Sequence, residues 1–155
     1  MPYVQWICQG HIEATPGEVI DYEIIRREIG ELGEQYKIRS IAIDRWNAAQ
    51  LATQLTGDGF EVVPFGQGYA SMNWPTKKLE ELVLGGKLAH GGNPVLRWMA
   101  SNVSIEKDAA DNWKPSKKRS PERIDGIVAL VMALDRATRE PSNVSVYETR
   151  GLMFL

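Results

Sequence analysis

The chain has 155 residues, of which 43% are hydrophobic and 25% charged, and 18 basic against 20 acidic side chains give a net charge of −2. These values are typical of one ordinary globular domain, and no apolar run approaches the ~18 residues of a membrane-spanning helix. The first residues lack a basic start followed by an apolar core, so no signal peptide is expected. The single cysteine, Cys8, excludes an internal disulfide and a cysteine-based zinc site.

The first third of the chain predicts two helices. Pro2 precedes a short helical stretch that ends before Gly10, because proline is favoured at a helix start and glycine after its end. Residues 15–17 (Thr-Pro-Gly) predict a turn. Asp21 can cap the following helix, in which apolar side chains at spacings of four, three and four residues form one stripe. This stripe consists of Ile25, Ile29, Leu32 and Tyr36.

The middle of the chain alternates between helices and strands. Residues 40–44 (SIAID) are almost all apolar and predict a buried strand, and residues 60–65 (FEVVPF) predict a second strand. Between them, apolar side chains over residues 48–55 predict an amphipathic helix. This order is typical of an α/β fold with a parallel strand pair.

The second half of the chain predicts more helices and a hairpin. Residues 76–84 and 95–101 predict helices, and residues 103–107 and 112–115 predict the two arms of a hairpin. A last helix is expected to start at Ser120 as its cap, with Pro121 as its first residue, and to run to about residue 140. The chain therefore divides into a domain of residues 1–140 and a tail of residues 141–155, expected to be extended or loosely docked.

Two carboxylates are the first candidates for chemistry. Asp44 ends a predicted central strand, at the edge of an α/β sheet where ligands bind, although it could equally cap the following helix. Asp125 is predicted about one turn inside the last helix, on a face that it shares with Ala129 and Ala133. This small-residue face would pack closely on the sheet, and a carboxylate buried there needs a metal or an ion pair, with Arg45 or Arg123 as partners.

Together the two carboxylates suggest a divalent-metal site. Mg²⁺ and Mn²⁺ prefer oxygen ligands, and two such ions about 4 Å apart can hydrolyse a phosphodiester. Two carboxylates are few for two ions, and Glu106 and Asp108, near the predicted hairpin, are weak reserves. His90, in a glycine-rich turn, is a candidate accessory residue, whereas His11 is treated as structural.

A basic segment, residues 114–123, precedes Asp125. It holds five basic side chains against Glu122 alone, whereas residues 11–36 hold seven acids against two arginines. Such a segment can contact a DNA backbone through its positive charge, or it can be a solvated loop. Trp113, in the predicted hairpin, is a further candidate for DNA contact. The basic side chains of the segment are Lys114, Lys117, Lys118, Arg119 and Arg123.

Several runs of the sequence resemble the C-terminal nuclease domain of the large terminase subunit of tailed bacteriophages. They include TPGEVIDYEIIRREI, IAIDRWNAAQLATQL, FGQGYASMNWPTKKLEELV, HGGNPVLRWMASNV and RIDGIVALVMAL. The resemblance implies a ribonuclease H-like fold, here an incomplete mixed sheet flanked by helices. It also implies an endonuclease that cuts concatemeric double-stranded DNA, with Asp44 and Asp125 as ligands of Mg²⁺ or Mn²⁺, and a location in the cytoplasm of a bacterial host. Its expected partners are DNA, the terminase ATPase domain, the small terminase subunit and the portal, with no membrane.

Departures from the family pattern predict a truncated nuclease. No phosphate-binding loop GxxxxGK[ST] occurs in the chain, and the strand that carries the family's first metal-binding Asp would lie upstream of residue 1. The chain would then be the product of a split gene, a remnant in an integrated phage genome or a cloned fragment. An exposed strand edge beside residues 41–44 would favour a homodimer, and the missing ligand would impair metal binding and cleavage. The alternative functions are a non-catalytic DNA-binding or assembly module and a different nuclease or resolvase of the same fold.

Overall fold

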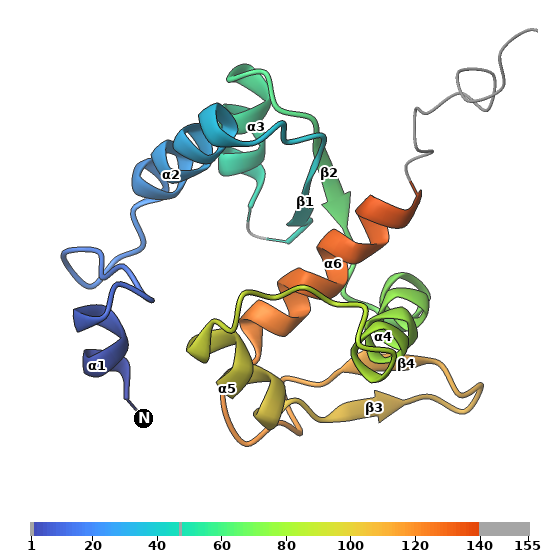
Figure 1. Cartoon of the computed structure of the whole chain (residues 1–155). Coiled ribbons are helices and arrows are strands. Elements are labelled where there is room, and N and C mark those ends of the chain that lie inside the picture. The colour runs from blue at the N-terminus through green and yellow to red at the C-terminus, as the bar shows by residue number, and fades with distance from the viewer. Residues whose placement is uncertain (1, 47, 140–155) are drawn as a thin grey trace, which may run out of the picture.

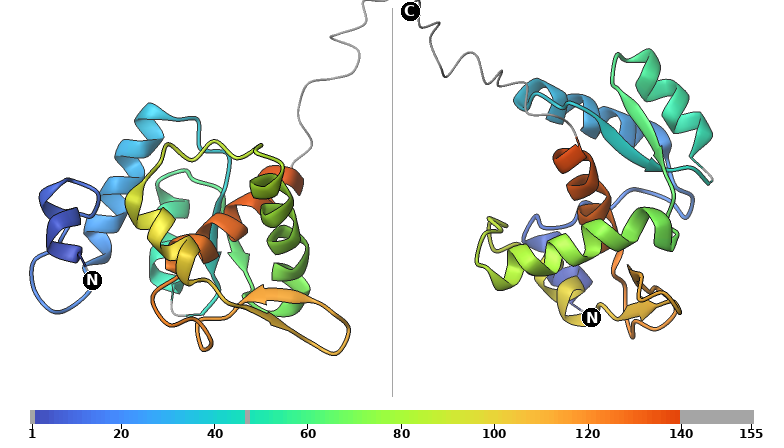
Figure 2. Two further views of the ribbon diagram at one scale, coloured as in Figure 1. Left: turned by 60° about the horizontal axis from the view of Figure 1, so that its bottom comes forward. Right: turned by 90° about the vertical axis from the view of Figure 1, so that its right-hand side faces the viewer.

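The computed structural model, which describes residues 2–46 and 48–139, is built around helix α6 (Asp125–Arg139). Figure 1 shows α6 passing through the middle of the molecule, where it contacts strand β1 (Ile41–Asp44), helix α4 (Tyr69–Leu84) and helix α5 (Pro94–Asn102). The right-hand view of Figure 2 shows the strand pair on one side of α6 and α4 on the other. The core between these elements consists of Phe65, Met72, Ile124, Val128, Val131 and Met132.

The N-terminal helix α1 (Tyr3–Cys8) is held on α5 by aromatic side chains. Trp6 is 6% exposed, and its ring packs edge to face on the ring of Trp98, with 5.5 Å between the centroids. Tyr3 contacts both of these rings in the same orientation. Edge-to-face contacts place the positive edge of one ring against the negative face of another, so this cluster fixes the position of a helix of only six residues.

The next two helices, α2 (Tyr22–Gln35) and α3 (Ala49–Gly57), pack against each other. The predicted cap of α2 is confirmed, because an Asp21 carboxylate oxygen accepts a hydrogen bond from the Glu23 amide at 2.9 Å. Gly33 lets α2 approach Phe60, since a β-carbon at Gly33 would lie 3.0 Å from the Phe60 ring.

The predicted parallel strand pair is confirmed. Strand β1 pairs with β2 (Val62–Phe65), with Ile41 opposite Val62 and Asp44 opposite Phe65. The prediction that β1 is buried is wrong, because all four of its residues are half-buried. The physical reason is that, within the described residues, β1 has a strand partner on one edge alone.

The predicted hairpin is also confirmed, as β3 (Ile105–Lys107) and β4 (Trp113–Pro115), paired antiparallel. It forms a sheet separate from the β1–β2 pair. The expectation of one mixed sheet is therefore wrong for the described residues, which form a mixed α/β domain with two short sheets. The hairpin packs on α4, where Asn73 accepts a hydrogen bond from the Trp113 amide at 2.9 Å and donates one to the Asn112 side chain at 3.0 Å.

Two helix starts differ from the sequence prediction. Helix α4 begins at Tyr69, seven residues before the predicted start, because Met72 and Pro75 are buried and tertiary packing outweighs the low helix propensity of proline. Helix α6 begins at Asp125, whereas Ser120 does not cap it: the Ser120 hydroxyl accepts a hydrogen bond from the Ser104 amide at 3.0 Å. The predicted tail, residues 141–155, lies outside the described residues. None of the described helices is long and apolar enough to cross a bilayer.

Candidate functional site

Asp44 lies at the carboxyl end of β1, as predicted. One of its carboxylate oxygens accepts a hydrogen bond from the Trp46 amide at 3.1 Å, which closes a short turn directly after the strand. The alternative role as a cap of the following helix is wrong, because the capping position of α3 belongs to Ala48, which makes no side-chain capping bond. The Asp44 carboxylate is thus positioned by the strand and keeps oxygen lone pairs for a ligand.

The position and the burial of Asp125 differ from the prediction. It is the first residue of α6 rather than a residue one turn inside, and its side chain is 56% exposed. Ala129 and Ala133, on the same face, are exposed as well, so this face is not packed on the sheet within the described residues. The predicted ion pair is present with a different partner, because the Lys117 ammonium lies 2.7 Å from an Asp125 oxygen.

The electrostatic state of Asp125 follows from this pair. The hydrogen bond from Lys117 lowers the pKa of the Asp125 carboxyl below its ordinary value, and the positive charges of Lys117 and Arg123 lower it further. Partial desolvation opposes this shift without reversing it. Asp125 is therefore a carboxylate at neutral pH, and its charge is balanced by Lys117.

The two candidate carboxylates lie at the same end of the layer formed by β1 and α6. At the other end, Arg136 of α6 donates a hydrogen bond to Ser40, the residue before β1, at 3.2 Å. Near the candidate site, Phe65 lies opposite Asp44, the last residue of β1. Phe65 also packs in the core with Val128, which lies in the first turn of α6. The strand and the helix therefore run in opposite directions, so the last residue of the strand and the first residue of the helix lie at the same end of the layer.

The residues present do not by themselves complete a divalent-metal site. Within the described part of the chain, no group of three or more His, Cys, Asp or Glu side chains is arranged to hold an ion. The reserve acids are occupied by hydrogen bonds: Glu106 accepts from the Tyr69 and Ser116 hydroxyls, and Asp108 accepts from the Asn112 amide within the hairpin. His90, the candidate accessory residue, is exposed and accepts a hydrogen bond from the Gly92 amide at 3.1 Å. The donor set at this end of the layer is thus two carboxylates, one of them already paired with an ammonium group.

The basic segment is split by the structure into an anchored and an exposed part. Lys114 lies in β4, half-buried, with its ammonium 4.7 Å from the centre of the Tyr69 ring. The other four basic residues are exposed beside the start of α6, where Lys117 contacts the candidate ligand Asp125. Trp113, the other candidate for DNA contact, is covered by the ammonium groups of Lys77 and Lys107, at 5.2 and 4.2 Å from its ring centre. The four exposed basic residues are Lys117, Lys118, Arg119 and Arg123.

A family model of the terminase large subunit endonuclease domain matches residues 1–140. The chain belongs to this family. It is 37% identical to the terminase large subunit of Enterobacteria phage HK97 over 141 residues, which are 90% of this chain and 28% of the phage protein. It is 32% identical to Protein YmfN of Escherichia coli (strain K12) over 138 residues, which are 87% of this chain and 30% of that protein. The resemblance noted in the sequence is thus confirmed.

Solved structures agree with the terminase assignment. The crystal structure of the HK97 bacteriophage large terminase aligns with a TM-score of 0.81 at 36% identity, over 87% of this chain and 29% of that one. The large terminase nuclease from the thermophilic phage G20c aligns with a TM-score of 0.59 at 18% identity, over 76% of this chain and 63% of that one, a likeness that shows the fold alone. The chain spans less than a third of the length of the relatives that it matches.

Two acidic residues of this terminase domain have roles that sequence reasoning missed. Asp135 is 4% exposed within α6 and accepts a hydrogen bond from the Arg139 guanidinium at 2.8 Å, a pair that their spacing of four residues could have indicated. Both carboxylate oxygens of Glu106 accept hydrogen bonds at 2.8 Å, from the Ser116 and Tyr69 hydroxyls. These bonds lower the pKa of Glu106. No sequence signal joins Glu106 to Tyr69, because 37 residues separate them.

Proposed function

We propose that this chain is the part of a phage DNA-packaging nuclease that presents Asp44, Asp125 and the basic segment to double-stranded DNA. Membership of the terminase endonuclease family supports a nuclease role. The observation that carries the proposal is the 2.7 Å contact between Lys117 and Asp125, because the basic segment, which would bind phosphate, thereby touches a candidate metal ligand. We assign the fold to the ribonuclease H-like class, to which the likeness to the G20c nuclease lends support.

Each side chain has a separate role in this proposal. Asp44 and Asp125 would each give carboxylate oxygens to Mg²⁺ or Mn²⁺, a hard cation that favours such ligands. Lys117 neutralises Asp125 until an ion binds, and then becomes free to contact a phosphate. Lys118 and Arg119, both exposed, would contact the DNA backbone without reading its sequence. Sequence-independent binding suits a nuclease that cuts long concatemeric DNA.

We further propose that the chain on its own cleaves DNA poorly. The described residues offer two carboxylates at the site, and further ligands would have to come from elsewhere. In the intact parent these ligands, together with the ATPase domain, the small terminase subunit and the portal, would complete the packaging machine. The parent would act in the cytoplasm of the bacterial host.

A non-catalytic DNA-binding or assembly module is the second candidate function. The observation that favours it is the same ion pair, since Lys117 satisfies the charge of Asp125 without a metal. In this case the basic segment would still bind DNA, whereas added Mn²⁺ would change neither binding nor cleavage.

One experiment separates the two functions. Binding of a labelled DNA duplex is measured by fluorescence anisotropy at several salt concentrations, with and without Mn²⁺, and nicking of supercoiled plasmid is measured in parallel. Replacing Lys118, Arg119 and Arg123 by glutamine should reduce the slope of log affinity against log salt by about 2.7, because each lost phosphate contact removes about 0.9.

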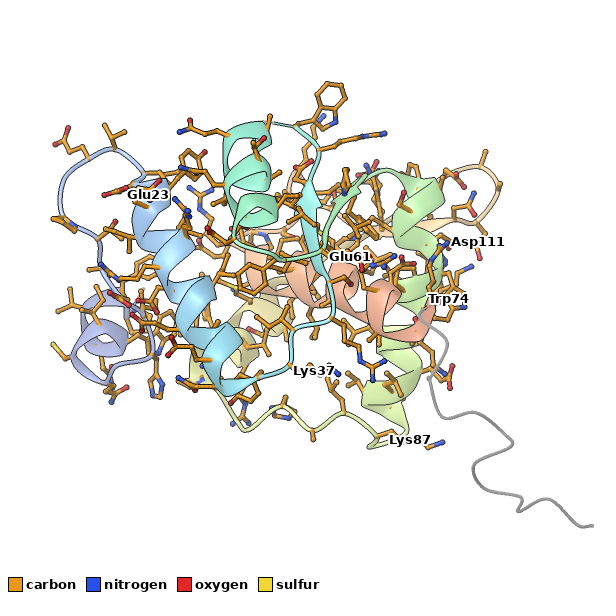
Figure 3. The ribbon with its side chains drawn as sticks, turned by 90° about the horizontal axis from the view of Figure 1, so that it is seen from above. Glu23, Lys37, Glu61, Trp74, Lys87 and Asp111 are labelled. Carbon is orange, nitrogen blue, oxygen red and sulfur yellow. The ribbon has the colours of Figure 1, made fainter. Side chains whose placement is uncertain are left out.

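Matched controls come from two lysines on other parts of the surface. Lys37 and Lys87 are exposed after α2 and after α4, and Figure 3 labels both. Their replacement by glutamine should leave the salt slope almost unchanged. If the triple variant and these controls behave alike, the basic segment is not the DNA-binding surface. Mn²⁺-dependent binding or nicking that Asp125→Asn abolishes would support the nuclease, whereas indifference to Mn²⁺ would support the non-catalytic module.

A further inference from the structure

An apolar groove lies apart from the candidate nuclease site. It has a volume of about 630 Å³ and opens between α4, α5 and the β3–β4 hairpin. Leu79, Leu96 and Val103 contribute to its walls, and Ile127 of α6 also lines it. Neither of the two candidate metal ligands lines the groove, so the proposed nuclease chemistry does not account for it.

One buried hydroxyl on the groove lacks a partner. Thr76 is 5% exposed and lines the groove, and its hydroxyl oxygen is buried without a hydrogen bond within the described residues. Buried polar groups in folded proteins are almost always paired, because an unpaired one loses its bonds to water without replacement. A ligand that brings a backbone amide or carbonyl group into the groove would satisfy this hydroxyl.

The exposed residues that line the groove are apolar at the end of α4 and charged on α4 and α5. Leu84 and Val83 line the groove at the end of α4 and are 81% and 56% exposed. Glu80 on α4 and Arg97 on α5 also line it and are exposed, and neither forms an ion pair within the described part of the chain. The groove therefore fits an extended peptide that has apolar side chains and one charge of each sign.

We propose that this groove binds the apolar C-terminal segment of the same chain, residues 152–155 (Leu-Met-Phe-Leu). The four consecutive large apolar side chains match the apolar walls. Glu148 and Arg150, just before them, carry one charge of each sign and complement Arg97 and Glu80. The backbone of the docked segment would provide the partner that the Thr76 hydroxyl lacks.

The length of chain after α6 suits this docking. The helix ends at Arg139, and Ile127 on the groove lies 12 residues earlier, about 18 Å along the helix axis. The 12 residues from 140 to 151, which precede the docked segment, span at most about 40 Å when extended, and a flexible chain of this length averages about 19 Å between its ends. The segment can therefore return to the groove without any change in the fold.

A disulfide-trapping experiment on the full chain tests this docking. The exposed Cys8 is first replaced by serine. Ala100, an exposed residue of the groove, and Met153 are then both changed to cysteine, and the rate of intramolecular disulfide formation under mild oxidation is measured by mass spectrometry. The control pairs Met153→Cys with Gln50→Cys, an exposed position on α3.

If the segment docks, the disulfide between Met153→Cys and Ala100→Cys should form at least about tenfold faster than the control disulfide with Gln50→Cys. The reason is that a bound segment has a high effective concentration at the groove. Phe154→Asp should remove this advantage. Leu84→Cys provides a second position on the groove if Ala100→Cys impairs folding. Equal rates for groove and control pairs would overturn the proposal, as would disulfides that join two molecules, which would assign the groove to a second copy. None of these outcomes depends on DNA cleavage, so this proposal and the nuclease proposal can fail separately.

Discussion

Replacing Lys117 by glutamine should change both the stability of the domain and its affinity for divalent metal. The substitution keeps a long polar side chain and removes the ammonium group that lies 2.7 Å from Asp125. Both side chains are more than half exposed, at 55% and 56%, so water screens the pair. Such pairs contribute about 0.2–1 kcal/mol, and we expect Lys117→Gln to lower the free energy of unfolding by about 0.5 kcal/mol at pH 7.

The sign of the pH dependence follows from the pKa of Asp125. In the folded chain the hydrogen bond from Lys117 lowers this pKa, so the pair stabilises the fold above the ordinary Asp value of about 3.9. The stabilisation is lost as the pH falls through the lower, folded-state value. The cost of Lys117→Gln should therefore shrink as the pH is lowered below the ordinary Asp value, and the pKa of Asp125 should rise toward that value in the variant.

The metal affinity should change in the opposite direction to the stability. Lys117 and a cation compete for the same Asp125 carboxylate, so removing the ammonium group should strengthen Mn²⁺ binding. The same 0.2–1 kcal/mol corresponds to about a 1.4- to 5-fold lower dissociation constant.

Three measurements check this prediction. Urea unfolding at pH 7 and near pH 2 gives the stability change, NMR titration gives the pKa of Asp125, and calorimetry gives the Mn²⁺ affinity. The control is Lys118→Gln, which removes an equal charge from the neighbouring exposed residue. The reasoning would be refuted by an equal cost of Lys117→Gln at both pH values, by weaker Mn²⁺ binding, or by a control variant with the same effects.

Three further predictions concern packing and assembly. Trp6→Ala should remove about 3 kcal/mol of the packing that holds α1 on α5, so hydrogen exchange of the α1 amides should accelerate while that of α6 does not. Asn73→Ala should cost about 1–3 kcal/mol in urea unfolding, because the Trp113 amide loses its acceptor; a cost no larger than that of Glu80→Ala, at an exposed position of the same helix, would contradict this role. The half-buried edge of β1 should support a concentration-dependent dimer in sedimentation equilibrium, and a monomer at all concentrations would refute that expectation.

Local sequence patterns predicted the elements of this domain because the determinants of each element lie close together in the chain. Asp21 caps the helix that follows it, and the apolar run at residues 41–44 forms a strand parallel to residues 62–65. The elements that were mispredicted depend on distant partners. Helix α4 extends through Pro75 because that residue is buried, and Ser120 bonds to Ser104 rather than capping α6.

For the candidate site as well, some features follow from the sequence and others only from the tertiary structure. The sequence by itself determined that Asp44 ends a strand, that Asp125 belongs to the last helix, and that basic residues precede it, because residue type and neighbours in the chain carry this information. Only the tertiary structure decided that Lys117 is the partner of Asp125 and that Asp125 is exposed. Ion pairs and burial depend on how segments approach in space, and no pattern along the chain records that approach.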